Sequence, residues 1–457
     1  MTVDTEIASN KLRNEEFKIW KKTIPLLYQH ISTMKPKYAN ASKGTIKDVP
    51  CCLTFSDEVI PNKANGTLST VIYYGIGNEI YSLDCDLPLG LHLQKDTLQP
   101  NEKLQLPQFD QIVSRIQSED LSPKWRAAAN CNIYKIKCVG NGKVVALLDS
   151  GAIVWFQEST ESPVSMVDGG AKIIPNKYEL EEDFVNDSLN KIDFDFDLSL
   201  NGEKIIVSQA VLNEDRTVIK VFSNIDKDLG KLLISLDLPG TKSVHNIKFY
   251  NDNIFGFCDN SGNLYFYDSR NLATPIWKIE NEHILSFAFS PLVETLLTTG
   301  GANGIINFWD VKRLTVKTAT TGGDKRQESL LSLSNHVEEP ISSVEFSASS
   351  PSEFITVGIS GSIYHWDVFN YFEKVSELFS EGGDQSAIDS LDTEEIQAES
   401  LTFYHTGGSR RHLGKSTKKN SVSVHPIIEG LIGTIDTDGL ITVYKPFTGV
   451  LPEAEDS

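Results

Sequence analysis

The sequence has few of the features that mark secreted or membrane-spanning proteins. Its 457 residues include only six cysteines, none in a Cys-x-x-Cys pair or at the spacing of a metal site, so we expect free thiols in a reducing compartment. No stretch approaches the roughly 18 consecutive apolar residues of a membrane-spanning helix, and residues 1–14 lack the apolar segment of a signal peptide. These absences predict a soluble, intracellular protein.

Basic residues are scarce relative to acidic ones. The chain has 42 Lys and Arg against 62 Asp and Glu, which gives a net charge of −20 at pH 7. Proteins that bind nucleic acid neutralise its phosphates with positive charge, so we expect no direct nucleic-acid partner. The acidic balance fits a basic protein partner or simple solubility.

The short patterns of common catalytic sites are missing as well, including Gly-x-Ser-x-Gly, His-Glu-x-x-His and Gly-x-Gly-x-x-Gly after a strand. Residues 414–416 (Gly-Lys-Ser) resemble the end of a phosphate-binding loop, but five residues instead of four separate them from Gly408. Asp193, Asp195 and Asp197 alternate with apolar residues, which indicates one polar face of a strand, although the pattern alone leaves a carboxylate pair open. We therefore expect no enzyme activity, no cofactor and no metal ion.

The chain does contain a repeated phrase, Gly-x-U-x-U-aromatic, where U is an apolar residue. Five clear copies begin at Gly151, Gly262, Gly304, Gly361 and Gly439. Two weaker copies occupy residues 78–83 and 217–222. Each copy reads as a tight turn, for which glycine supplies a positive φ, followed by a half-buried strand. The copies lie 42 to 78 residues apart, and the shortest spacings match one four-stranded propeller blade.

Seven copies predict an all-β fold, a seven-bladed β-propeller with an N-terminal α-helical arm. We place the arm at residues 1–45, the propeller at 46–448 and an acidic tail at 449–457. Insertions into the propeller are expected near residues 91–125, 160–190 and 370–420. These longer stretches account for the spacings that exceed a single blade.

The arm is predicted to contain an amphipathic helix over residues 11–34. Apolar side chains recur there every three or four residues, at Phe17, Trp20, Ile24, Leu27 and Ile31. Pro25 lies inside this pattern, so we expect a kink or a restart of the helix at that point.

The repeated phrase resembles the WD repeat, most clearly at residues 308–310 (Phe-Trp-Asp) and 365–367 (His-Trp-Asp). Residues 14–28 are similar to the N-terminal helix of the retinoblastoma-associated, histone-binding WD-repeat family. The whole chain resembles more closely the fungal Wtm/Ume group of transcriptional modulators, in phrases such as residues 343–347 (Ser-Val-Glu-Phe-Ser) and 442–449. Within that group its two ends look most like the meiotic-gene repressor.

The resemblance implies a non-catalytic adaptor subunit of a Sin-type histone deacetylase co-repressor complex. Such a subunit would repress transcription, including that of meiotic genes, and would act in the nucleus, with the cytoplasm as a second location. The expected partners are the Sin-type scaffold, the deacetylase and, further, histones, with no membrane partner. Two alternatives stay open: a nuclear retention factor for ribonucleotide reductase small subunits, and a histone chaperone subunit.

The resemblance also implies a binding groove. In the histone-binding relatives the N-terminal helix and an acidic loop clamp a basic histone helix. Residues 381–400 carry seven acids and no Lys or Arg here, a composition that alone would indicate a solvated loop. Carried over to this chain, the apolar contacts from the helix would be Leu26 and Leu27. Phe403 and Tyr404 would form the aromatic floor of the groove. The acids that face the basic helix would be Glu394, Glu395 and Glu399.

Two further expectations concern the neighbourhood of this groove. By the same resemblance, residues 51–55 would form the strand that closes the propeller ring and would lie against the last blade near Tyr444. Residues 409–419 contain five Lys or Arg and no acid, a composition that fits either a site for an acidic peptide or phosphate group or a solvated loop.

Overall fold

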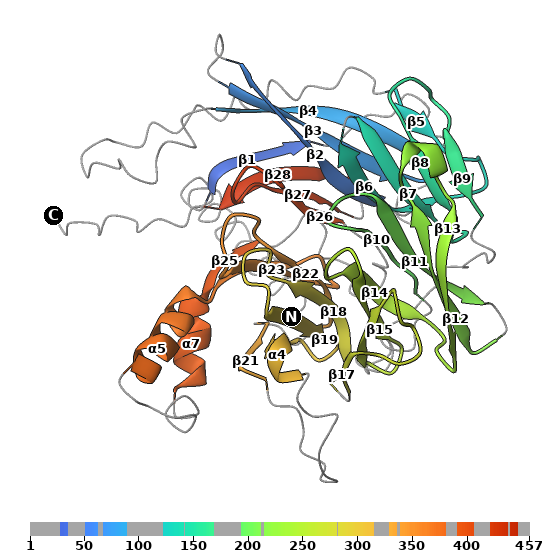
Figure 1. The fold of residues 1–457 in the computed structure, drawn as a ribbon. Coiled ribbons are helices and arrows are strands. Elements are labelled where there is room, and N and C mark those ends of the chain that lie inside the picture. The colour runs from blue at the N-terminus through green and yellow to red at the C-terminus, as the bar shows by residue number, and fades with distance from the viewer. Residues whose placement is uncertain are drawn as a thin grey trace, which may run out of the picture.

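The computed structural model describes residues 28–34, 51–62, 67–88, 122–140, 142–168, 193–211, 214–280, 282–314, 329–335, 339–380, 391–405, 421–436 and 439–446. The strands in these ranges form seven antiparallel sheets of four strands each. The sheets follow one another around a ring, as Figure 1 shows. The seven-bladed β-propeller predicted from the repeat is confirmed.

The first three blades are built as follows. Blade one contains β2 (Cys51–Asn62), β3 (Thr67–Ile76), β4 (Glu79–Pro88) and β5 (Trp125–Arg126). Blade two contains β6 (Ile133–Gly140), β7 (Lys143–Leu148), β8 (Ile153–Phe156) and β9 (Ser165–Val167). Blade three contains β10 (Phe196–Leu198), β11 (Lys204–Val211), β12 (Arg216–Ser223) and β13 (Leu232–Pro239), with a 3-10 turn at Asp226–Asp228.

The other four blades complete the ring. Blade four contains β14 (Val244–Phe249), β15 (Ile254–Asp259), β16 (Leu264–Asp268) and β17 (Trp277–Ile279). Blade five contains β18 (Ile284–Phe289), β19 (Leu296–Gly301), β20 (Ile305–Asp310) and β21 (Leu331–Ser334), with the short helix α4 (Val311–Leu314) after β20. Blade six contains β22 (Ile341–Phe346), β23 (Glu353–Gly358), β24 (Ile363–Asp367) and β25 (Leu401–His405). Blade seven contains β26 (Val422–Val424), β27 (Ile432–Ile435), β28 (Ile441–Pro446) and β1 (Tyr28–Met34).

Every copy of the repeated phrase forms the third strand of a blade. The weaker copies are β4 and β12, and the clear copies are β8, β16, β20, β24 and β28. The glycines that open the clear copies all have φ between 73° and 86°, the left-handed region that side chains with a Cβ avoid. The local turn requirement therefore explains why glycine recurs at this position.

Two of these glycines differ in what surrounds them. At Gly262 an added Cβ would lie 2.5 Å from the Cα of His283, whereas at Gly361 it would meet nothing within 4 Å. We expect Gly361→Ala to lower the free energy of unfolding by about 1–2 kcal/mol, the cost of a left-handed alanine. Gly262→Ala should lower the free energy of unfolding by about 1–3 kcal/mol more, because the backbone at His283 must also move. Urea unfolding of both variants measures the difference, and equal losses would contradict the close contact at Gly262.

The ring is closed by a strand from the N-terminal side of the chain. β1 pairs antiparallel with β28, with Ile31 opposite Tyr444 and Met34 opposite Ile441. The helix predicted for residues 11–34 is therefore wrong for 28–34, while 11–27 lie outside the described residues. Pro25 removes a helical hydrogen bond just before this point, and β-branched Ile31 and Thr33 favour a strand. Pairing with the open edge of β28 then stabilises residues 28–34 as a strand.

The predicted closing strand at residues 51–55 is also wrong. These residues belong to β2, the first strand of blade one, which pairs with β3 and not with the last blade. Leu53 and Phe55 are buried and share an apolar core with Met34 of β1 and Ile441 of β28. The segment thus lies beside blade seven, as the resemblance implied, but contacts it through side chains instead of closing its sheet.

The hydrophobic core lies between neighbouring blades. Phe266 of blade four, for example, packs edge-on against Phe287 of blade five, with ring centroids 5.8 Å apart. In blade six the Trp366 indole donates to the Thr356 hydroxyl at 3.0 Å, and that hydroxyl donates to the Asn335 side chain at 2.9 Å. Since each interface is shared by two blades, every blade is stabilised by packing against its neighbours in the ring.

Blade six carries a pair of helices between its third and fourth strands. α5 (Phe369–Ser380) and α7 (Thr393–Ser400) pack on each other and stand outside the ring, at the lower left of Figure 1. Apart from Phe369, they fall in the range 370–420 where an insertion was predicted. Among the described residues no helix is long and apolar enough to cross a membrane, and all six cysteines are free thiols.

Candidate partner-binding surface

The two aromatic residues predicted to form the groove floor lie on β25 and have different surroundings. Phe403 is 8% exposed and sits in the seam between blades six and seven, with its ring centroid 5.4 Å from that of His365. Tyr404 is only partly buried and packs against Tyr364 of the same blade at 4.8 Å. Tyr404 thus keeps surface that a partner can reach, while Phe403 supports the strand from inside.

Tyr28, the first residue of β1, ties the N-terminal side of the chain to this seam. Its ring packs edge-on against Phe403 at 5.1 Å and Tyr444 at 5.6 Å. Its hydroxyl is hydrogen-bonded to Nδ1 of His405 at 2.8 Å. Burial raises the pKa of Tyr28 to about 12, so the hydroxyl stays protonated at neutral pH. The chain therefore enters the propeller directly beside β25.

The predicted helix contacts Leu26 and Leu27 lie outside the described residues. They directly precede Tyr28 in the sequence and stay predicted contacts of the groove.

The three predicted acids lie on a helix, where a loop was expected. α7 begins after Asp392, whose carboxylate accepts hydrogen bonds from the amides of Glu394 at 2.9 Å and Glu395 at 3.4 Å, an N-cap. Glu394 and Glu395 are exposed in the first turn, where the helix dipole favours negative charge. Ile396 is buried and faces the blade core. The expected solvated loop is thus wrong for residues 393–400, and 381–390 lie outside the described residues.

The third acid, Glu399, is already paired. Its carboxylate lies 3.0 Å from the ammonium of Lys374 on α5, an ion pair with both side chains 37% exposed. α5 adds two exposed acids that the sequence analysis missed, Glu373 and Glu377. The sequence does contain a signal for the α5 helix, because apolar residues recur there at helical spacing: Tyr371, Phe372, Val375 and Leu378. The structure thus brings Glu394, Glu395 and Glu399 onto one helix next to β25 and extends the acidic surface onto α5.

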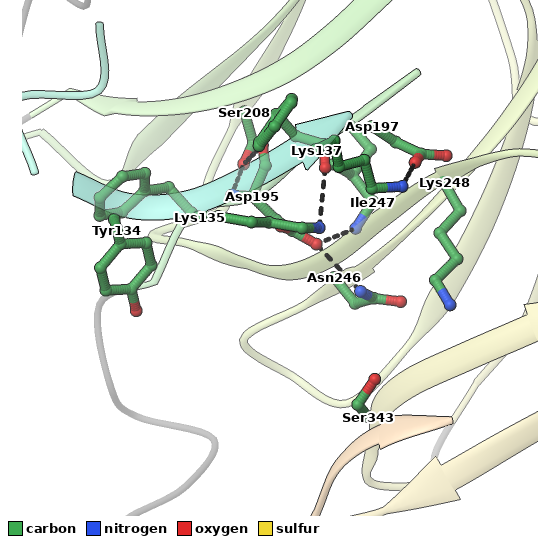
Figure 2. Close-up of polar contacts among 12 residues, drawn as sticks. Tyr134, Lys135, Lys137, Asp195, Asp197, Ser208, Asn246, Ile247, Lys248 and Ser343 are labelled. Carbon is green, nitrogen blue, oxygen red and sulfur yellow. Dashed lines mark hydrogen bonds and ion pairs between the residues drawn. The ribbon is translucent and has the colours of Figure 1, made fainter. Parts of the chain in front are cut away.

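A second polar cluster lies among the first strands of blades two, three and four (Figure 2). The Lys135 ammonium is 2.7 Å from an Asp195 oxygen, and the other oxygen of Asp195 accepts from the Asn246 side chain at 2.9 Å and the Ile247 amide at 3.2 Å. Lys137 forms an ion pair with Asp197 one step along the same strands. The alternating carboxylates predicted as one polar face of a strand are therefore ion-paired and hydrogen-bonded partners of β6 and β14.

The charges in this cluster stabilise one another. Burial opposes the charged form of Asp197, but the ammonium groups of Lys137 and Lys135 outweigh it and lower the pKa of that carboxyl. Burial lowers the pKa of Lys248, whose ammonium reaches from blade four to the Val344 carbonyl of blade six at 3.0 Å. Since each group has fixed partners, a structural role accounts for this cluster.

Comparisons with known proteins agree with this fold. No family model matches the chain. The transcriptional regulatory protein UME1 of Saccharomyces cerevisiae is 34% identical over 458 residues, which cover 96% of this chain and 95% of that protein. The transcriptional modulator WTM1 of the same yeast is 31% identical, over 94% of this chain and 98% of its own length.

A more distant relative is the histone acetyltransferase type B subunit 2 of Debaryomyces hansenii, which is 28% identical over 199 residues, 43% of this chain and 41% of that protein. The similarity to UME1 and WTM1 instead runs through nearly all of each chain. The chain therefore belongs to the family of WD-repeat transcriptional regulators that contains UME1 and WTM1.

Proposed function

We propose that this protein is a non-catalytic adaptor subunit of a nuclear, Sin-type histone deacetylase co-repressor complex, and that it represses genes that include meiotic ones. Its relatives are named as transcriptional regulators and modulators. The propeller supplies many exposed turns on a rigid ring, an arrangement suited to holding several partners. The carboxylates of the buried polar cluster around Asp195 have structural partners, which leaves the surface to carry function.

We further propose that the surface formed by α7, β25 and the chain before Tyr28 binds a basic helix of a histone. Leu26 and Leu27 would supply apolar contacts and Tyr404 the floor, with Phe403 beneath it. Glu394, Glu395 and Glu399 would face the basic side chains. The observation that supports this proposal is the contact of Tyr28 with Phe403 and His405, because it joins the start of β1 to β25, the strand that directly follows α7.

A histone chaperone subunit is the second candidate function. It is favoured by the similarity of 43% of the chain to the histone acetyltransferase type B subunit 2. The two candidates share the histone surface but differ in the complex around it. Affinity purification of the full chain distinguishes them, since the first requires the scaffold and deacetylase and the second requires histones with assembly factors alone.

The test of the groove reverses two charges on α7. Glu394→Lys with Glu395→Lys should weaken binding of a basic histone-helix peptide about tenfold or more. Each exposed pair contributes only about 0.2–1 kcal/mol, and the added repulsion brings the total past the 1.4 kcal/mol of a tenfold change. Glu399 is left in place because its ion pair with Lys374 helps to hold α5 against α7. Binding is measured by titration of the labelled peptide.

The matched control is another exposed, adjacent pair of acids. Glu214→Lys with Asp215→Lys makes the same charge change between β11 and β12 of blade three and should leave peptide binding within about twofold. Both double variants should still co-purify with the scaffold and the deacetylase. If the parent chain binds no histone peptide while the scaffold co-purifies, the groove proposal is wrong and the adaptor proposal stands.

A further inference from the structure

One end of the propeller collects the exposed apolar side chains. In an antiparallel four-stranded blade, the first-to-second and third-to-fourth connections lie at the same end. Of the large apolar side chains exposed in the described ranges, all except Ile305 lie in, or within three residues of, such a connection. Leu200, Leu292 and Ile427 are the most exposed of those in first-to-second turns, at 77%, 55% and 61%. We call this end of the ring the turn face.

The turn face is also acidic in a regular way. The first-to-second turns of blades three to seven span residues 199–203, 250–253, 290–295, 347–352 and 425–431. Four of them contain one carboxylate each, Glu203, Asp252, Glu294 and Glu429, and in blade six Glu353 begins β23 directly after the turn. These turns contain no Lys or Arg, and Lys204, the first residue of β11, donates its ammonium to the Asp252 carbonyl at 2.7 Å. Apolar tips next to unbalanced negative charge are complementary to a basic amphipathic segment.

These turns form a connected surface. The Asn201 amide of blade three donates to the Asp252 carboxylate of blade four at 3.4 Å. The Tyr250 hydroxyl of blade four donates to the Glu294 carbonyl of blade five at 2.8 Å. Neighbouring turns are thus held together from blade three to blade five, and one partner segment can contact several of them.

Between blades six and seven the turn face contains a cavity of about 150 Å³. It lies between the turn at residues 347–349 and residues of 424–430, with the exposed Ile427 at its rim. This volume accommodates one aliphatic or aromatic side chain. The α5–α7 pair also begins at this end of the ring, with Phe369 exposed right after β24.

We infer that the turn face docks a basic amphipathic segment of a partner protein, with an apolar side chain in the cavity between blades six and seven. The site uses the first-to-second turns and not α7, which adjoins them at blade six, and it does not depend on the groove proposed there. A second copy of this chain fits less well, because two such faces would bring like charges together. The acidic turns specify the charge of the partner, and the apolar tips supply the contact area.

The test uses the full chain and two synthetic helical peptides that share one leucine face. One peptide has lysines on its other face and the second has glutamates. Fluorescence anisotropy at physiological ionic strength should show binding of the lysine peptide alone. Leu292→Asp with Ile427→Asp should weaken it about tenfold or more, because charge enters an apolar contact. Glu203→Lys with Glu294→Lys should weaken it similarly and increase binding of the glutamate peptide.

The controls make the same changes elsewhere. Ile305→Asp and Glu280→Lys lie at the opposite end of the blades and should change binding less than about twofold. If these control variants lost as much binding of the lysine peptide as the turn-face variants, the attraction would be unspecific and the proposal would be overturned. A loss only in Glu394→Lys with Glu395→Lys would place the peptide in the α7 groove and also overturn it. The proposal is also overturned if the parent chain binds neither peptide. It is overturned likewise if sedimentation shows a dimer of the parent chain that Ile427→Asp dissociates.

Discussion

Replacing Asp195 by alanine should lower the free energy of unfolding by about 3–5 kcal/mol, the usual loss when one partner of a buried ion pair is removed. The Asp195 side chain is fully buried and the Lys135 side chain is 9% exposed. Without the carboxylate, the Asn246 and Ile247 amides lose this acceptor. The Lys135 ammonium loses its counter-charge and keeps the Phe196 carbonyl as an acceptor. A loss of this size is a large fraction of a typical domain's stability, and urea or thermal unfolding measures it.

A surface pair provides the matched control. Asp237 and Arg216 lie 2.6 Å apart, nearly the same distance as Asp195 and Lys135, but their side chains are 53% and 42% exposed. Asp237→Ala should cost only about 0.2–1 kcal/mol, because water replaces the lost partner. Similar losses in the two variants would show that burial does not set the strength of the inner pair.

The Asp195→Ala loss should also depend on pH. Burial lowers the pKa of Lys135, and the Asp195 charge opposes that shift in the parent. In the variant the folded chain therefore gives up the Lys135 proton at lower pH than the unfolded chain. The unfolded state then binds more protons, so the free energy of unfolding rises with pH. The difference in free energy of unfolding between the parent and the Asp195→Ala variant should therefore shrink as pH is raised towards the pKa of an unfolded lysine, about 10.4.

The partners in this cluster show where sequence reasoning reaches its limit. The alternation around Asp195 predicts a strand with one polar face, because side-chain direction is local information. Nothing local connects Asp195 with Lys135, which lies 60 residues earlier and meets it only when blades two and three pack. Likewise the repeat predicts the third strand of every blade, since a turn glycine and an alternating strand are both local signals.

Outer strands were harder to predict for the same reason. β5 has only two residues and β9 only three, too few to show a period. Ile31 fits the helical pattern of the arm and yet lies in β1, because its position is decided by the edge of β28 at the other end of the chain. For the candidate site, the acids were visible as composition, while the N-cap at Asp392 and the Lys374–Glu399 pair required the helices to be placed.

Tyr28→Ala should cost about 3 kcal/mol of stability, the lower end of the range for emptying a buried aromatic site, since Tyr28 is partly buried. The substitution removes ring contacts with Phe403 and Tyr444 and the hydrogen bond to His405. Tyr28→Phe keeps the ring and should cost only about 0.5–1.5 kcal/mol for that bond. The loss should concentrate at the closure of the ring, where Tyr28 holds the first residue of β1.

Amide hydrogen exchange locates that loss. If Tyr28 pins β1 to the ring, Tyr28→Ala should speed exchange along β28, whose residues pair with β1, more than along β3 of blade one. Thr33→Ala is the control on the same strand, because Thr33 is exposed and its hydroxyl makes one long contact, 3.4 Å, with that of Thr442 among the described residues. It should change stability by less than about 0.5 kcal/mol. Uniform acceleration over all blades would mean that the ring opens as one unit. In that case Tyr28 stabilises the whole propeller and not specifically the seam where β1 meets β25.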